Sequence, residues 1–155
     1  MSSNILKIAR GAAIAAIYAA VTIIFHPLSY GPVQVRISEA LTLLPCLWVE
    51  AIPGLFIGCV IANIFGGYGP LDIFLGGAAT LIAAVMSYLA GNRILAAAAP
   101  VAINAVIVGS YLSFLTGTPI ALSALYVGFG EAVACLALGL PLLRYLEKTN
   151  FSRKK

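Results

Sequence analysis

The chain has 155 residues, of which 62% are hydrophobic and 9% are charged, and its net charge is +4 at pH 7. Soluble domains carry about 25% charged residues, so this chain has too little polar surface for a water-soluble globule. The composition excludes a soluble enzyme, a nucleic-acid-binding protein and a disordered chain, and it predicts an integral membrane protein whose surroundings are the lipid bilayer.

Apolar stretches between charged or turn-rich breaks predict six membrane-spanning helices, each of which needs roughly 20 mostly apolar residues. In chain order they are residues 8–25, 37–49, 52–65, 71–89, 95–115 and 120–146. The second stretch is short for a bilayer unless neighbouring helices thin the membrane or bury its ends. The predicted fold is therefore an all-α membrane protein, a six-transmembrane-helix bundle forming a single domain.

The basic residues predict the orientation of these spans. With six spans both termini lie on one side of the membrane, and eight of the nine Lys and Arg residues fall on that side, leaving Arg36 on the other. The eight are Lys7, Arg10, Arg93, Arg144, Lys148, Arg153, Lys154 and Lys155. Basic loops stay inside the cell, so we expect both termini to be cytoplasmic in a multi-pass protein of the bacterial plasma membrane.

Motifs for enzymatic chemistry are missing from the sequence. It has no Gly-rich phosphate loop ending in Lys-Ser/Thr, no HExxH and no nucleophile elbow. The chain is therefore predicted not to be an enzyme, and its energy must come from an ion gradient or a partner protein. Cys46, Cys59 and Cys135 lack CxxC spacing and are expected to be buried small side chains, so neither a metal site nor a cofactor is predicted.

Six polar residues in or beside the spans are candidates for a substrate-binding site, because polar groups in a membrane normally have a partner or line a cavity. They are Arg36, Glu39, Asn63, Asp72, Asn104 and Glu131. Glu131 lies among glycines roughly 18 Å into the sixth span, where it either contacts a ligand or pairs with an internal cation. The amide of Asn104 suits either the edge of a heterocycle or an interhelical hydrogen bond.

The other candidates lie near the outer ends of their spans. Arg36 and Glu39 stand three residues apart, on one face of a helix, so they either neutralise one another or Arg36 orients Glu39 toward a ligand. Asp72 is either a helix cap or a ligand contact, and Asn63 lies across the same turn. Because the candidate site contains several acidic groups but only one Arg, it favours a small ligand with N–H donors or a positive charge. Nearby tyrosines can stack on a flat ring of such a ligand.

Small residues repeat every four positions in the first span, which is typical of close contacts between helices. One stripe consists of Ala12, Ala16 and Ala20, and another of Gly11, Ala15 and Ala19. A similar stripe occurs in the third span. These stripes either pack inside the bundle or form a docking face for a partner.

Residues 33–41 read Val-Gln-Val-Arg-Ile-Ser-Glu-Ala-Leu, and further distinctive stretches occupy residues 51–58, 61–67, 71–73 and 130–131. Through them nearly the whole chain resembles the QueT group of substrate-binding S components of energy-coupling factor (ECF) transporters. The resemblance implies six helices, a pocket open to the outside, and uptake of a queuosine precursor, a 7-deazaguanine base such as preQ1 or queuine.

The resemblance also implies partners: a transmembrane T subunit and two cytoplasmic ATPase subunits. The S component would topple within the membrane to carry its substrate inward, and the Ala12-x-x-x-Ala16 spacing would dock the T subunit. Site roles carry over most directly to Arg36, Glu39 and Glu131. A carboxylate can accept the N1–H and 2-amino group of a guanine-type edge together, and an aminomethyl cation calls for a second carboxylate, so Glu39 and Glu131 are candidates for these two tasks.

Three other functions remain open. One is a stand-alone ion- or proton-coupled secondary transporter with Glu131 as its relay, although no inverted repeat is detectable. Another is an S component for a different small vitamin. The last is a membrane-embedded assembly factor without a transport role.

Overall fold

The computed structural model describes residues 3–31 and 33–149, in which every regular element is a helix. In chain order the elements are α1 (Ser3–Ile24), α2 (His26–Ser29), η1 (Ile37–Cys46), α3 (Ala51–Gly66), η2 (Asp72–Gly76), α4 (Gly77–Leu89), α5 (Arg93–Thr116), α6 (Ile120–Ala132), η3 (Val133–Gly139) and α7 (Leu140–Lys148). The segment η1 is a 3-10 helix, whereas η2 and η3 are π-helical turns within longer helices. The all-helical prediction is confirmed.

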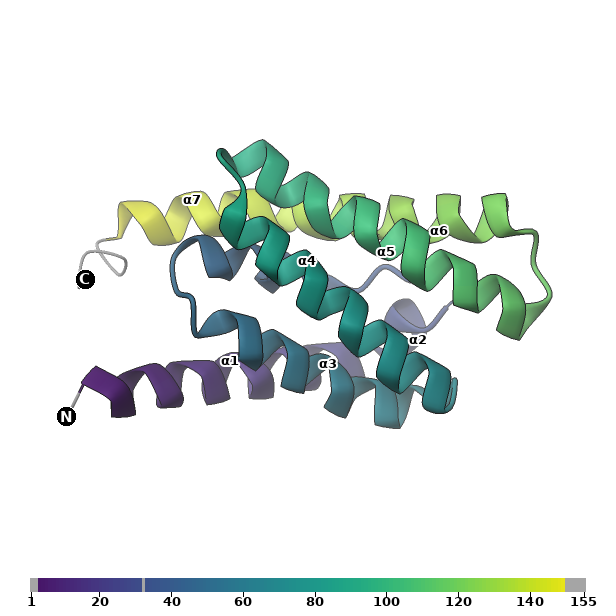
Figure 1. The fold of residues 1–155 in the computed structure, drawn as a ribbon, viewed down its shortest axis with the longest axis horizontal. Helices are drawn as coiled ribbons and strands as arrows, with labels where there is room; N and C mark the ends of the chain where they lie inside the picture. The colour runs from purple at the N-terminus through teal and green to yellow at the C-terminus, as the bar shows by residue number, and fades with distance from the viewer. Residues whose placement is uncertain (1–2, 32, 150–155) are drawn as a thin grey trace.

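The elements run back and forth between the two ends of the molecule (Figure 1). Helix α1 packs against α3, α3 against α4, α4 against α5, and α5 against α6. The start of α1 and the end of α7 lie at the same end of the bundle (Figure 1). We call this the terminal end, and the opposite end the loop end. Three of the predicted cytoplasmic basic residues, Arg153, Lys154 and Lys155, lie outside the described residues.

Four helices are long and apolar enough to cross a membrane, and they correspond to the first, fourth, fifth and sixth predicted spans. They are Ser3–Ile24, Asp72–Leu89, Arg93–Thr116 and Ile120–Lys148. Large apolar side chains such as Phe74, Leu125 and Phe129 are exposed on their outer faces, as lipid contact requires. The chain has the fold of a multi-pass helical membrane protein, while the count of six spans and the cytoplasmic termini stay predictions.

The second predicted span is not a continuous α-helix. Its ten-residue 3-10 helix η1 rises about 20 Å, against about 15 Å for an α-helix of the same length. This segment lies inside the bundle, in contact with α1, α3, α4, α5 and η3, and most of its residues are buried. Backbone that departs from α geometry is tolerated at membrane depth when protein surrounds it. Burial among the neighbouring helices therefore explains how this short segment can lie within the membrane.

The two small-residue stripes of α1 face opposite ways. Gly11, Ala15 and Ala19 are buried, whereas Ala12, Ala16 and Ala20 are exposed. The buried stripe packs against glycines of α3 at a distance that leaves no room for a side chain. A Cβ atom added to Gly54 would lie 2.5 Å from the carbonyl oxygen of Gly11, and one on Gly58 would lie 2.8 Å from that of Ala15. One stripe therefore holds the bundle together, and the other is free on its surface.

The cysteine prediction holds for two of the three residues. Cys59 and Cys135 are buried, but Cys46 is exposed, because it ends η1 where the chain leaves the bundle interior.

Candidate functional site

A cluster of buried polar side chains lies toward the loop end of the bundle. It contains all six candidate residues, each at most 4% exposed. Arg36 and Glu39 come from η1 and the residue before it, Asn63 from α3, Asp72 from η2, Asn104 from α5 and Glu131 from α6. Five separate elements therefore converge on one buried polar region.

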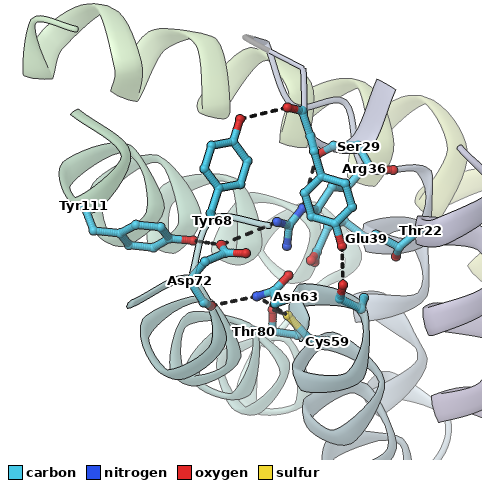
Figure 2. A network of polar contacts seen from close by, with 12 residues as sticks. Thr22, Ser29, Arg36, Glu39, Cys59, Asn63, Tyr68, Asp72, Thr80 and Tyr111 are labelled. Atoms are coloured by element: carbon cyan, nitrogen blue, oxygen red, sulfur yellow. Dashed lines mark hydrogen bonds and ion pairs between the residues drawn. The ribbon is translucent and has the colours of Figure 1, made fainter. Parts of the chain in front are cut away.

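Asp72 is the most heavily connected member of this cluster (Figure 2). The hydroxyl of Tyr111 donates to its Oδ1 at 2.5 Å, and Nη2 of Arg36 lies 3.7 Å from the same oxygen. The amide of Asn63 donates to the backbone carbonyl of Asp72 at 2.8 Å. Oδ2 of Asp72 has no hydrogen-bond partner in the described residues, so both carboxylate oxygens are accounted for without a hydrogen bond that caps a helix.

Arg36 forms its ion pair with Asp72, and not with Glu39 as the helical spacing suggested. The backbone of Arg36 is extended, with φ −86° and ψ 99°, and helical geometry begins only at the next residue. The spacing rule for one helix face therefore does not apply to this pair. Nε of Arg36 donates to the carbonyl of Ser29 at 3.4 Å, and its guanidinium lies 5.0 Å from the ring centre of Tyr30.

The other two carboxyl groups have neutral partners. The hydroxyl of Tyr18 donates to Oε1 of Glu39, and the side chain of Asn104 lies beside Glu131. The thiol of Cys135 lies 3.8 Å from Oε2 of Glu131. None of the three ion pairs found among the described residues includes Glu131, which argues against the alternative of an internal cation partner.

The cluster has an excess of negative groups and of hydrogen-bond acceptors. It sets one guanidinium against three carboxyl groups, a formal charge of −2 if all are ionised. Five of the six candidates also have a buried polar atom with no hydrogen-bond partner in the described part of the chain: Arg36 Nη2, Glu39 Oε2, Asn63 Oδ1, Asp72 Oδ2 and Asn104 Oδ1. Buried polar atoms are normally paired, so this set suits a ligand that supplies several donors, a positive charge and an acceptor for Arg36.

Sequence reasoning missed the way tyrosines and one amide contribute to the cluster. Tyr18 and Tyr111 hold carboxylates through their hydroxyl groups, a role different from the ring stacking that the sequence suggested for tyrosines. Gln34 is 4% exposed, and its Nε2 has no partner among the described residues. Gln34 lies within the distinctive stretch of residues 33–41, two residues before Arg36, and that position was the signal available in the sequence.

Tyr30 closes the cluster toward the loop end. Its hydroxyl donates to the carbonyl of Ala62 at 2.7 Å, and burial raises the pKa of Tyr30 to about 12, so this donor keeps its proton at physiological pH.

Within the described residues, no group of three or more His, Cys, Asp or Glu side chains is placed to hold a metal ion.

Fold and site together define a multi-pass helical membrane protein with a buried, acceptor-rich polar cluster suited to a small ligand. A family model described as the QueT transporter matches residues 8–148. The chain belongs to the QueT transporter family, which confirms the resemblance found in the sequence and assigns the protein to membrane transport. No curated protein and no solved structure matches the chain.

Proposed function

We propose that this chain is the substrate-binding S component of an ATP-driven ECF importer in the bacterial plasma membrane, and that it captures a queuosine precursor of the 7-deazaguanine class. The observation that carries the proposal is the set of unpartnered buried atoms in the polar cluster, in a chain that belongs to the QueT transporter family. Six spans with cytoplasmic termini are part of this proposal.

The chemistry of a 7-deazaguanine complements the cluster. Its ring N–H and amino groups are donors for the free oxygens of Glu39 and Asp72, and its exocyclic oxygen is an acceptor for Arg36. The aminomethyl group of preQ1 adds a cation, which suits Glu131 because this carboxyl group has no ion-pair partner in the described residues. We therefore assign the base edge to Glu39 and the aminomethyl cation to Glu131.

The exposed stripe of α1 supports a docking role. Ala12 and Ala16 border a mainly apolar groove of about 560 Å³ between α1 and α3, with Ile57 and Ile61 on its other side. Small side chains let a further helix approach closely. In our proposal this groove receives the transmembrane T subunit, whose two ATPase partners supply the energy, and the loaded chain topples to carry its substrate inward.

The test is ligand binding by the purified full-length chain, alone in detergent, followed by thermal shift and calorimetry with preQ1, queuine, guanine and riboflavin. We expect selective stabilisation by a deazaguanine without dependence on Na⁺. Glu131→Gln should weaken the binding of preQ1, whereas Glu147→Gln, a matched change in an exposed ion pair, should leave it unchanged. A lack of response to every compound would refute the substrate class, and a requirement for Na⁺ would favour a secondary transporter.

A further inference from the structure

A cavity lies beside the polar cluster at the loop end and is not used in the function proposed above. Its volume is about 230 Å³, which is below the roughly 300–1,000 Å³ typical of pockets that enclose a whole ligand. Tyr30 and Gln34 line this cavity, and Tyr30 also covers the guanidinium of Arg36 in the cluster. The cavity is thus an extension of the cluster, with room for a substituent of the ligand.

The direction of the extension follows from helix α6. Ser123 and Val127 line the cavity, and Glu131 follows them at intervals of four residues, so the three side chains lie along one face of the helix. At 1.5 Å per residue, Val127 is about 6 Å and Ser123 about 12 Å along the axis from Glu131. A group attached to a nitrogen held by Glu131 would therefore extend past Val127 toward Ser123.

The walls of the cavity are polar in a way that suits hydroxyl groups. Nε2 of Gln34 is buried without a partner among the described residues. Ser123 and Tyr126, each of which carries a hydroxyl group, also line this space, while the ring of Tyr68 is fixed by its hydrogen bond to the carbonyl of Tyr30 at 2.8 Å. Neutral donors and acceptors beside aromatic rings are suited to a hydroxylated ring, and none of the described residues that line the cavity is a carboxylate that would favour a second cation.

We propose that this cavity is a second subsite, which binds a hydroxylated ring carried on the aminomethyl nitrogen of the deazaguanine, so that the chain prefers queuine to preQ1. The inference rests on the proposed function, because it takes the base to lie in the cluster with its aminomethyl nitrogen at Glu131. Queuine carries a dihydroxylated cyclopentene ring on this nitrogen, whereas preQ1 carries none.

The experiment compares calorimetric titrations of preQ1 and queuine into the purified full-length chain in detergent. We expect wild type to bind queuine about tenfold more tightly than preQ1, since each hydrogen bond is worth about three- to tenfold in affinity. A Ser123→Ala/Tyr126→Phe double variant should lose most of this advantage while its affinity for preQ1 stays within about twofold of wild type. Tyr88→Phe, an exposed tyrosine of α4 outside both sites, should change neither affinity.

The possible failures are distinguishable. Equal affinities of wild type for the two bases, or equal losses for both in the double variant, would overturn the second subsite while leaving the proposed function intact. Absence of binding by both bases would overturn the proposed function and the subsite with it.

Discussion

The buried ion pair between Arg36 and Asp72 gives the most direct test of how the polar cluster is held together. Arg36 and Asp72 are 5% and 0% exposed in their side chains, and the closest charged atoms are 3.7 Å apart. At an effective dielectric constant of about 20, this separation corresponds to about 4.5 kcal/mol of attraction. Asp72→Asn removes the attraction and leaves a buried guanidinium unpaired, a change that typically costs about 3–5 kcal/mol.

The matched control is the ion pair between Arg93 and Glu147 at the terminal end. Its atoms are closer, at 2.7 Å, but the side chains are 56% and 28% exposed, and exposed pairs contribute only about 0–1 kcal/mol. The reasoning therefore predicts that burial outweighs distance, so Glu147→Gln should destabilise the fold far less than Asp72→Asn.

The assay is thermal unfolding of the purified variants in detergent without ligand. On the scale of about 2–4 °C per kcal/mol for a chain of this length, Asp72→Asn should lower the midpoint by about 6–20 °C and Glu147→Gln by less than about 4 °C. Tyr111→Phe, which removes a hydrogen bond to Asp72 but no charge, should fall between them. Similar shifts for Asp72→Asn and Glu147→Gln would refute the argument that burial makes the inner pair strong.

Three further predictions concern ligand binding, docking and packing. Glu39→Gln should weaken the binding of every guanine-type base at least several-fold. Glu131→Gln should weaken the binding of preQ1 more than that of guanine, which lacks the aminomethyl cation. Unchanged affinities in calorimetry would show that these residues do not belong to the binding site. Ala16→Leu, on the exposed stripe, should block uptake by the complete transporter but preserve ligand binding by the purified chain. Ala15→Leu, on the buried stripe, should instead impair folding. Loss of ligand binding in Ala16→Leu would contradict a docking role for the exposed stripe. Gly58→Ala should cost about 1–3 kcal/mol of stability, because its Cβ would lie 2.8 Å from the carbonyl oxygen of Ala15, and a wild-type unfolding midpoint would show that α1 and α3 can separate freely.

Local signals in the sequence were sufficient to place helices α3 and α5. The third and fifth predicted spans, residues 52–65 and 95–115, differ by at most two residues at either end from α3 (Ala51–Gly66) and α5 (Arg93–Thr116). In α5, the side chain of Asn92 accepts a hydrogen bond from the first turn, and Gly117 ends the helix in a left-handed conformation. Caps of this kind are encoded within a few residues, so they can be predicted without knowledge of the tertiary fold.

The candidate site was predictable in its residues but not in their partners. A polar group within an apolar span is conspicuous because of its cost in the membrane, and this alone identified Asp72 and Glu131. The partner of Arg36 is Asp72 on another element, which depends on how the bundle packs and not on spacing along the chain. The same holds for Tyr18, whose hydroxyl reaches Glu39 from α1.

The polar cluster coincides with the places where the backbone departs from α geometry, and the departure accounts for the direction of its carboxylates. The 3-10 helix η1 begins directly after Arg36, the π turn η2 begins at Asp72, and η3 begins two residues after Glu131. A π turn inserts one residue into an α-helix and rotates all that follows by about 100°. Such turns occur frequently at functional sites.

In α6 to α7, Glu131 and Leu143 are both buried, yet twelve residues of regular α-helix would place them about 120° apart. With one residue taken up by η3, the angle falls to about 20°. The same holds for Asp72 and Thr80, also both buried, whose angle falls from about 80° to about 20° through η2. In each of these two helices, the π turn therefore lets a carboxylate face the polar cluster while later side chains of the same helix face the core. In a regular α-helix of 3.6 residues per turn, these side chains would point in different directions.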